Sequence, residues 1–477
     1  MANVAQEGAT DRAPGQPTTI GGLRTSGYQS RSVKQELRHN VIRQLQTNEP
    51  LFPGIVGFEE TVVPQIENAL LSGQDIIFLG ERGQAKTRIA RTLVRLLDEW
   101  VPMVAGCEIN DDPLDPICRP CRDLIAAQGD ETPVSWLHRS ERYGEKLATP
   151  DITIADLIGE VDPIKVAEGR YLSDELTIHY GLLARTHRGI FVINELPDLA
   201  ERIQVGLLNI MEERDVQIRG YKVRLPLDLF VVASANPEDY TNRGRIITPL
   251  KDRFGSQIRT HYPRSIEHET DIMERERGVF QDERFETIVP PYMREIVAEV
   301  THLARKSSDI SQRSGVSVRV SVANYENLLS SALKRAIRLH ERQVAPRISD
   351  LLALTQSTGG KIELETMGDR DEEKVIEKLV QKAVVNVFNR HFAVHEFDEL
   401  IANFEHGLRV DVGDTLPSLD YVRQAAEVGG FTPAIKKLGV QGNPSQIASA
   451  IEFVLEGLHL NRKLNKDRAS GRMRYRG

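Results

Sequence analysis

The feature that most constrains the fold is a short glycine-containing loop between an apolar strand and a helix. The run Asp75–Leu79 predicts a buried strand, and Thr87–Trp100 predicts a helix with one apolar face. The loop between them follows the phosphate-binding pattern G-x-x-x-x-G-K-[ST], with alanine at the second glycine: Gly80-Glu81-Arg82-Gly83-Gln84-Ala85-Lys86-Thr87. A strand, a tight loop and a helix in this order are typical of a parallel sheet whose loop binds a nucleotide.

The loop supplies the groups that a nucleoside triphosphate needs. Gly80 permits the tight turn, the backbone N–H groups of the loop cradle phosphate oxygens, and the helix N-terminus adds partial positive charge. Lys86 neutralises the terminal phosphates, and the Thr87 hydroxyl holds Mg²⁺. Ala85 places a Cβ where the backbone approaches phosphate, although no side chain that carries a Cβ is smaller. We therefore predict an ATP–Mg²⁺ site at this loop, the alternative being a chance strand–turn–helix.

A second apolar strand, Gly189–Ile193, ends in Asn194 and Glu195. We expect this strand to lie beside the loop strand, so that Glu195 activates the attacking water and Asn194 joins Thr87 in holding Mg²⁺. The usual pair here is Asp-Glu, and Asn194 lacks the charge. Two consequences stay open, weaker Mg²⁺ binding and a slow, regulatory ATP turnover. The alternative is a buried strand that merely ends in two polar residues.

A third apolar strand, Leu229–Ser234, is followed by Ala235, Asn236 and Pro237. We expect Asn236 to sit between the other two strand ends, where its amide reaches the γ-phosphate or the attacking water. Asn before Pro is also a common way to start a loop, which is the alternative.

Two arginines are candidates for sensing or stabilising charge on the γ-phosphate. Arg253, in Leu250–Gly255, is a candidate arginine finger that reaches the nucleotide of a neighbouring subunit. The alternative for Arg253 is a surface ion pair with Asp252 or another nearby acid. Arg319 lies at the start of a predicted helix, from which it would contact the γ-phosphate and couple ATP to domain rotation.

Patterns along the rest of the chain predict four parts. Residues 1–30 lack an apolar pattern and predict a disordered tail, and residues 31–263 alternate strands with helices, which predicts an α/β fold with a parallel sheet in an αβα sandwich. Residues 264–345 predict an all-α lid, and residues 346–477 a helical C-terminal extension. The predicted helices outside the loop region are Ser32–Gln46, Ile266–Glu276, Pro291–Lys306, Val320–Gln343 and Glu372–Phe392. The end of the chain, Arg462–Gly477, carries seven basic residues and one acid, which predicts a solvated end or, alternatively, electrostatic docking to an acidic partner.

Composition excludes several classes of protein. A net charge of -8 and 6% aromatic residues make nucleic acid an unlikely partner, because non-specific binding needs bulk basicity and stacking needs aromatic side chains. No apolar run approaches the roughly 18 residues of a membrane span, and the N-terminus has no secretory h-region. Three cysteines cannot build a disulfide framework, so we expect a cytoplasmic location.

With these motifs assembled, the chain resembles the AAA+ ATPases, and specifically the clade of MoxR-type ATPases and the magnesium-chelatase I subunit. The resemblance spans about residues 51–343. Its further markers are Gly54-Ile55-Val56-Gly57, Asp156–Asp162, Leu207–Arg214, Ala235–Glu238 and Leu250–Gly255. By this resemblance Ile55 and Val56 line the adenine pocket, Asn236 is the first sensor, Arg319 is the second-sensor arginine and Arg253 is the finger acting in trans.

The same resemblance implies an assembly and several functions. It implies a hexameric ring, a partner with a von Willebrand A domain, and insertions at about Asp151–Thr177 and Asp215–Leu227 that face the pore or a partner. We expect an ATP-driven motor that remodels or activates an unidentified client together with that partner. The alternatives are subunit I of a magnesium chelatase, which inserts Mg²⁺ into protoporphyrin, and a nucleotide-gated scaffold with slow turnover.

The three cysteines form a separate cluster within 15 residues of each other. Cys118 and Cys121 have the C-x-x-C spacing that lets two thiolates bind one ion, Cys107 is a third candidate ligand, and His138 is a candidate fourth. Three interpretations remain open, which are reduced thiols in an insertion, a structural zinc site and a redox switch.

Overall fold

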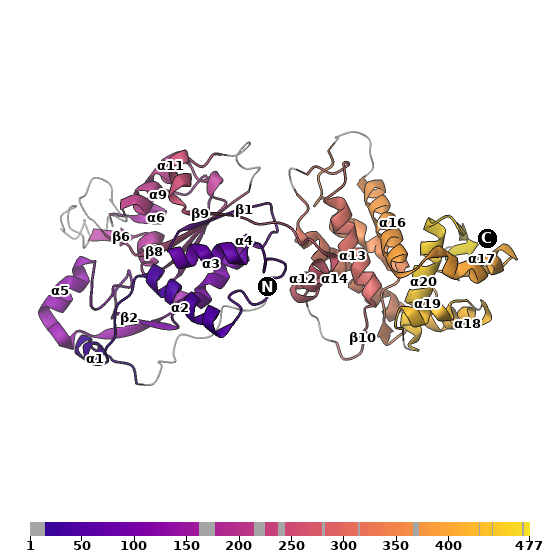
Figure 1. The fold of residues 1–477 in the computed structure, drawn as a ribbon, viewed down its shortest axis with the longest axis horizontal. Helices are drawn as coiled ribbons and strands as arrows, with labels where there is room; N and C mark the ends of the chain where they lie inside the picture. The colour runs from indigo at the N-terminus through magenta and orange to yellow at the C-terminus, as the bar shows by residue number, and fades with distance from the viewer. Residues whose placement is uncertain are drawn as a thin grey trace. The chain divides into compact units, whose positions relative to one another are not determined.

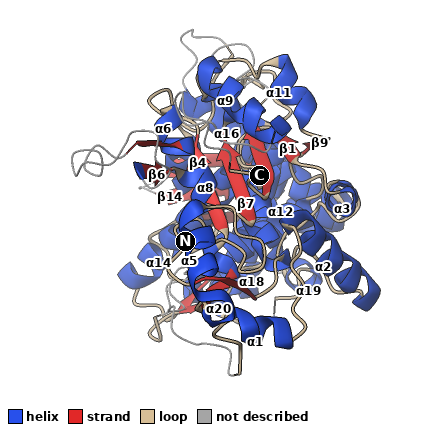
Figure 2. Ribbon diagram, turned by 90° about the vertical axis from the view of Figure 1, so that its left-hand side faces the viewer, coloured by secondary structure: helices blue, strands red, loops and turns tan. Residues whose placement is uncertain are grey.

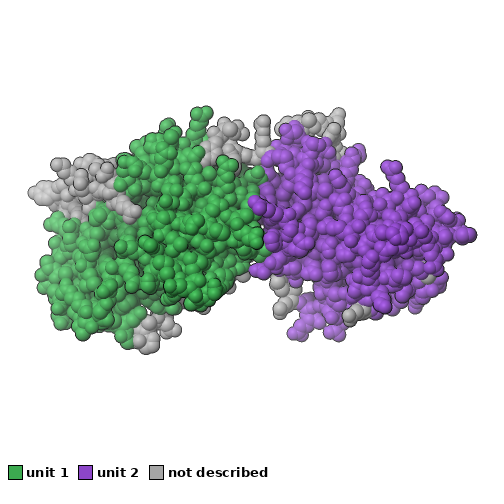
Figure 3. Space-filling view, in the orientation of Figure 1, with its two compact units in different colours: residues 1–261 green, residues 262–477 purple. Residues whose placement is uncertain are grey.

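The chain forms two compact units, Met1–His261 and Tyr262–Gly477 (Figure 3). The computed structural model describes residues 15–161, 177–213, 225–236, 244–278, 282–312, 315–365, 372–428, 430–440, 442–469 and 472–477. The first boundary expected from the sequence, after residue 263, therefore falls two residues earlier, after His261. None of the helices in these ranges is long and apolar enough to cross a membrane.

A five-stranded sheet forms the centre of the first unit. Its order is β4-β7-β8-β1-β9, and each of the four neighbouring pairs is parallel. The strands are β1 (Ile76–Leu79), β4 (Tyr143–Leu147), β7 (Gly189–Asn194), β8 (Leu229–Ala235) and β9 (Ser256–Arg259). The prediction that the strand at Gly189 lies directly beside the loop strand was wrong, because β8 lies between β1 and β7. Asn236, directly after β8, is accordingly between the other two strand ends, as expected.

Side chains alternate between the two faces of this sheet, and each face carries its own apolar core. On one face Ile76, Phe78 and Val232 pack with helices α2 (Val33–Thr47), α3 (Val63–Ser72) and α4 (Lys86–Thr92). On the other, Ile77, Phe191 and Ala233 pack with helices α6 (Ile154–Ile158), α8 (Leu182–Arg185), α9 (Glu201–Glu213) and α11 (Thr248–Arg253). The result is the predicted αβα sandwich (Figures 1 and 2).

The helix that follows the loop is shorter than the pattern predicted. Helix α4 ends at Thr92 and continues as a 3₁₀ turn, Leu93–Leu96, before strand β2 (Trp100–Val104) pairs antiparallel with β3 (Val134–His138). Side chains of α2 stop the helix here. Asn40 donates to the Leu96 carbonyl at 2.9 Å, and Glu36 accepts from the Asp98 backbone N–H at 2.6 Å. Tertiary contacts therefore override a helical pattern that continues to Trp100.

The prediction of a disordered tail was wrong for residues 15–30, and residues 1–14 lie outside the described ranges. Helix α1 (Ile20–Thr25) is capped by the Thr19 hydroxyl and buries Ile20 and Leu23. Its start is tied to the β3 region by backbone hydrogen bonds from Ile20 to Thr132 and from Val134 to Thr18. Two apolar side chains and these bonds suffice to order a segment whose composition is that of a disordered chain.

The second unit is built around one core. Its helices α12 (Ile266–Glu276), α13 (Pro291–Ala304), α14 (Val318–Arg338) and α16 (Glu372–His391) confirm the four predicted helices to within a few residues, and α20 (Pro444–Leu460) packs against α16 and α18 (Ser418–Val428). Residues of the predicted lid and of the predicted extension share the same core. The boundary expected between residues 345 and 346 is therefore absent from the described part of the chain.

The sequence analysis missed a sheet in the second unit. Strands β12 (Arg409–Val412), β14 (Arg472–Arg476) and β13 (Asn465–Ala469) form an antiparallel sheet in that order. The basic segment Arg462–Gly477 is thus not simply a solvated end, since Tyr475 is buried and Arg474 pairs with Asp411 at 2.6 Å. The extension consequently contains an antiparallel sheet as well as helices. Its strands alternate basic and other residues, so the pattern resembled a charged tail more than a strand.

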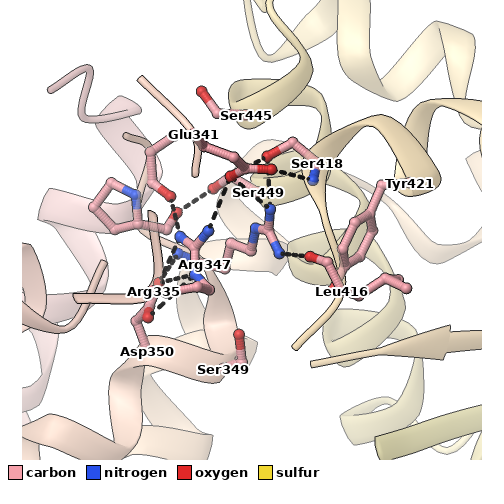
Figure 4. A network of polar contacts seen from close by, with 12 residues as sticks. Arg335, Glu341, Arg347, Ser349, Asp350, Leu416, Ser418, Tyr421, Ser445 and Ser449 are labelled. Carbon is pink, nitrogen blue, oxygen red and sulfur yellow. Dashed lines mark hydrogen bonds and ion pairs between the residues drawn. The ribbon is translucent and has the colours of Figure 1, made fainter. Parts of the chain in front are cut away.

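A buried polar network explains why the two predicted parts form one unit (Figure 4). Arg347, fully buried, donates to the Leu416 carbonyl at 2.8 Å and to the Ser418 hydroxyl at 2.7 Å. Arg335 at the end of α14 donates to Asp350 at 3.0 Å. Glu341 accepts from the Ser418 backbone at 2.5 Å, so charged groups near α14 bond to the segment that leads into α18. Removing one member leaves the others buried without partners.

Replacement of Arg347 tests this network. Arg347→Ala is expected to lower the free energy of unfolding of the second unit by about 3–5 kcal/mol, because Glu341 and Ser418 lose a buried partner. Denaturant unfolding measures the change. Arg338→Ala, on the exposed side of α14, is the matched control and is expected to change stability by less than about 0.5 kcal/mol. Equal stability of both variants would contradict the role of the network.

Candidate nucleotide-binding site

The loop between β1 and α4 has the tight geometry that its glycines predict. The Gly80 N–H donates to the Ala235 carbonyl at 3.1 Å, and a Cβ at Gly80 would lie 2.0 Å from Thr260 Oγ1 and 2.3 Å from Gln84 Oε1. Gln84 Oε1 accepts from the Glu81 N–H at 3.1 Å and from the Thr260 hydroxyl at 2.8 Å. Glycine is therefore required at position 80, and the loop is fixed to the residue that follows β9.

Ala85 lies in the left-handed region, with φ 55°, directly before the first residue of α4. This region favours glycine, and an L-residue there costs roughly 1–2 kcal/mol. The backbone thus keeps the conformation of the glycine that the motif normally carries. Gly83, with φ 76°, takes the other left-handed position of the turn, which glycine adopts without strain. The departure at Ala85 changes strain more than it changes the path of the loop.

Lys86 connects the loop to the end of β8. Its ammonium group donates to the carbonyl oxygens of Gly80 and Glu81, the latter at 2.7 Å, and to Asn236 Oδ1 at 2.8 Å. Asn236 is buried, and its Nδ2 has no hydrogen-bond partner among the described residues. An orphaned buried donor beside a lysine suits an anionic oxygen, since it otherwise carries a desolvation cost.

The ends of β7 and β8 meet Thr87 through hydroxyl and amide groups. Thr87 Oγ1 donates to Asn194 Oδ1 at 3.3 Å, and the Ser234 hydroxyl donates to the same oxygen at 3.1 Å. The Glu195 N–H donates to Ser234 Oγ at 3.2 Å, and Glu195 has φ 57°, an uncommon value for a residue with a side chain. The side-chain oxygens of Thr87 and Asn194 are neutral and suit Mg²⁺, which prefers hard oxygen ligands. The structure therefore places two hydrogen-bonded pairs at the start of α4, Lys86 with Asn236 and Thr87 with Asn194, next to Glu195.

A carboxylate that the sequence analysis did not single out lies behind Asn194. Asn194 Nδ2 donates to Glu145 Oε1 at 2.7 Å, and Glu145 also accepts from Arg91 at 2.7 Å and from the Tyr143 hydroxyl at 3.0 Å. Burial, and then the charge of Glu145, raise the pKa of Tyr143, which keeps its hydroxyl a donor. Because a carboxylate only accepts hydrogen bonds, Glu145 holds the amide group of Asn194 and turns its oxygen toward Thr87. No motif marks Glu145, since the strand β4 itself was not predicted.

The adenine-pocket candidates lie near the helix after the loop. Ile55 is nearly buried and shares a core with Ile89 of α4. A Cβ at Gly54 would lie 3.7 Å from Arg88 Nη2, so the segment that carries Ile55 and Val56 contacts α4. The structure thus brings these residues close to the loop, and their role in binding adenine stays a prediction.

Neither candidate arginine, Arg253 or Arg319, is placed at the phosphate-binding loop by the described residues of the first unit. Arg253 pairs with Glu212, and both side chains are close to half exposed, which is the surface ion pair kept as an alternative. Arg319 is exposed in the first turn of α14 and belongs to the second unit. Their finger and sensor roles stay predictions.

The described ends of the first insertion pair as β5 (Gly159–Val161) and β6 (Ile178–Tyr180). Several predicted segments lie outside the described ranges, namely residues 162–176, most of the second insertion, Arg214 and Pro237–Glu238.

The chain that leaves β9 is held at each residue before the second unit begins. Thr260 bonds to the loop through Gln84, and His261 Nε2 lies 2.8 Å from the Thr61 hydroxyl. The His261 ring also meets the edge of Phe58, with 5.0 Å between centroids. In the second unit, the Arg305 guanidinium lies 4.3 Å from the centre of the Tyr262 ring.

The structure brings the three cysteines together but leaves His138 out. Cys107, Cys118 and Cys121 gather around Asp111, whereas His138 Nδ1 bonds to the Ser140 hydroxyl at 2.7 Å. Hydrogen bonds from Cys118 and then Cys121 lower the pKa of the Cys107 thiol. The prediction of His138 as a ligand was therefore wrong, and Asp111 was missed because an Asp-Asp-Pro turn resembles an ordinary loop.

Comparisons with known proteins give distant relatives in sequence. No protein-family model matches the chain. It is 26% identical over 248 residues to the magnesium-chelatase 38 kDa subunit of Acidiphilium rubrum, which is 49% of this chain and 64% of that subunit. It is 25% identical over 174 residues to the uncharacterized protein YeaC of Bacillus subtilis (strain 168), which is 33% of this chain and 52% of YeaC. The chain thus spans between half and two thirds of these two proteins.

Solved structures add a weaker likeness. A model of the complex between subunits BchI and BchD of magnesium chelatase aligns with 68% of this chain and 98% of that chain, at 20% identity and a TM-score of 0.36. Because this score is low, the assignment depends on the sequence relationship and on the loop.

The parallel sheet, with a phosphate-binding loop between β1 and α4, defines a P-loop nucleotide-binding protein. By its sequence the chain is more particularly similar to a magnesium-chelatase subunit.

The pairing of Asn194 with Glu145 predicts the outcome of restoring the usual aspartate. Asn194→Asp places a carboxylate against Glu145 and is expected to destabilise the first unit by about 1–3 kcal/mol and to weaken Mg²⁺-dependent nucleotide binding. The double variant Asn194→Asp/Glu145→Gln supplies a donor to the new carboxylate and is expected to recover both. Thermal unfolding and nucleotide titrations over a Mg²⁺ series measure this. A single variant as stable as the wild type would contradict the contact.

Proposed function

We propose that the chain binds ATP with Mg²⁺ at the Gly80–Thr87 loop and hydrolyses it. One observation carries this proposal, namely that the ends of three parallel strands bring two asparagines to the loop, where Asn236 accepts from the loop lysine and Asn194 accepts from the loop threonine. Parallel pairing brings the strand ends together, but it does not require the residues there to be polar. Amide, hydroxyl and ammonium groups gathered beside a phosphate-binding loop are the groups that a bound phosphate needs.

Each residue of this set has a task in hydrolysis. The loop N–H groups and Lys86 bind the phosphates, and Asn236 offers its unpaired Nδ2 to the γ-phosphate or to the attacking water. Glu195 accepts the proton of that water. Thr87 and Asn194 would hold Mg²⁺, which neutralises charge on the phosphates. Glu145 positions Asn194 so that an oxygen, and not an amine, faces Thr87.

The cellular role that we propose is that of a ring-forming motor which remodels or activates a client together with a partner carrying a von Willebrand A domain. The resemblance of residues 51–343 to MoxR-type ATPases supports this role. The sequence relationship to a magnesium-chelatase subunit supports the alternative, a subunit of a complex that inserts Mg²⁺ into protoporphyrin. The neutral Asn194 supports a third role, a nucleotide-gated scaffold with slow turnover. Pull-down from the native cell and porphyrin metallation assays distinguish the first two roles.

Two substitutions separate binding from hydrolysis. Lys86→Ala is expected to weaken ATP binding by roughly 10- to 100-fold, because charge-assisted hydrogen bonds to phosphate are lost. Glu195→Gln is expected to keep ATP binding and to slow hydrolysis by roughly 10²- to 10⁴-fold. Arg38→Ala, on the exposed face of α2, is the control for loss of a cation. ATP binding with no hydrolysis above background in the wild type would favour the scaffold over the motor.

The role of Arg253 in trans has a matched control in its own ion pair. Arg253→Ala is expected to lower the hydrolysis rate of the assembled protein by roughly 10³-fold or more while ATP binding persists. Glu212→Ala breaks the same surface ion pair but leaves the arginine, and is expected to keep the rate, since exposed pairs contribute only about 0–1 kcal/mol. The hydrolysis rate and the oligomer mass of each variant are measured on the same sample. Similar rates for both variants would assign Arg253 to the ion pair alone.

A further inference from the structure

We propose that Cys107, Asp111, Cys118 and Cys121 form a structural zinc site that fastens helix α5 to the first unit. One ligand atom from each residue can be chosen so that all four lie within 4.8 Å of one another. The residues come from the turn after β2, from the loop that follows, and from the start of α5 (Arg119–Gln128). This site is separate from the nucleotide loop and from the function proposed for it.

The spacing of the sulfur atoms suits a single ion. Cys107 Sγ and Cys118 Sγ are 4.0 Å apart, and all three cysteines are free thiols. A tetrahedral zinc ion, with Zn–S bonds of about 2.3 Å, holds two sulfurs about 3.8 Å apart. A disulfide has about 2 Å between its sulfurs, so at 4.0 Å these two thiols are in contact but not bonded. The irons of an iron–sulfur cluster would need more room between the ligands than this set leaves.

Asp111 is the fourth ligand on independent grounds. Its side chain is fully buried, Oδ2 accepts from the Cys118 N–H at 2.9 Å, and Oδ1 has no hydrogen-bond partner in the described part of the chain. A buried carboxylate oxygen without a donor is costly unless a cation satisfies it. The next residue, Asp112, is already used by Arg188 at 3.2 Å and by Ser30 at 2.5 Å.

Backbone groups hold Cys107 in the orientation that a metal requires. The N–H groups of Ile109 and Asp111 each donate to Cys107 Sγ at 3.4 Å. Such outer hydrogen bonds orient ligands and favour the thiolate. Cys118 occupies the N-cap of α5, where the positive end of the helix favours a thiolate as well.

Helix α5 needs such a fastening because it has little apolar surface of its own. All its residues are described, and of them only Cys121 is buried, with Leu124 and Ile125 partly buried against the core. The helix lies at the outer edge of the first unit (Figure 1). A metal ion supplies the cohesion that a small apolar contact cannot, as in small metal-stabilised domains.

Metal analysis of the full-length protein, purified without a metal-affinity tag, tests the proposal. We expect about one zinc ion per chain. Cys121→Ser and Asp111→Asn are expected to lose most of this zinc, whereas His138→Ala, which removes the histidine outside the cluster, keeps it. A wild-type protein with zinc near zero, or with iron in place of zinc, overturns the proposal. An Asp111→Asn variant that holds as much zinc as the wild type overturns the assignment of Asp111 as the fourth ligand.

A second measurement on the wild type avoids variants that fail to fold. We expect the three thiols to resist a thiol reagent until a strong chelator is added, and then to react together. Trypsin cleavage after Arg122 is expected to accelerate on chelation, because α5 loses its fastening. Thiols that react equally with and without chelator overturn the proposal. ATP binding at the loop is measured in parallel, so that failure of the zinc site and failure of the nucleotide site are distinguished.

Discussion

The first unit depends on the parallel pairing of β7, β8 and β1. Because parallel strands end at the same edge, residues separated by more than a hundred positions in the chain meet there. The insertion of β8 between the other two strands decides the distances. It puts Asn236 against Lys86 and puts Ser234 between Asn194 and Glu195. A different strand order would separate these groups even with every motif intact.

Departures from a motif are better judged with the surrounding structure than by the motif alone. The missing carboxylate at Asn194 suggests a weakened metal site, yet Glu145 stands one hydrogen bond away and is itself held by Arg91 and Tyr143. Asn194 and Glu145 together carry one negative charge, as an aspartate would. That charge lies on Glu145, behind Asn194, and is therefore further from Thr87. Ala85 is similar, since the backbone keeps the left-handed conformation and accepts the strain. Both departures keep the arrangement of the site and alter its energetics.

The sequence predicted those features that depend on neighbouring residues. The loop, the strands β1, β7 and β8, and the helices α12 and α16 follow from apolar periodicity and a short motif, and they are confirmed. The features it missed depend on contacts between distant segments. Glu145 lies on a strand with alternating polar residues, and Asp111 becomes a candidate ligand only when the turn folds. The single core of the second unit joins apolar residues from both predicted parts, with Arg347 bonded to Ser418 between them. Periodicity carries no information about such partners.

The clamped residues at the end of β9 have a mechanical consequence. Thr260 is bonded to the phosphate-binding loop through Gln84, and His261 is held by Thr61 and Phe58, while Tyr262 is already held by Arg305. Gln84 therefore belongs to two places at once, because its side-chain oxygen accepts from the Glu81 N–H inside the loop and from the Thr260 hydroxyl at the end of β9. Any shift of the loop that moves Gln84 is felt at Thr260, so the nucleotide loop and the last residues of the first unit are joined by a side chain and not by chain connectivity alone.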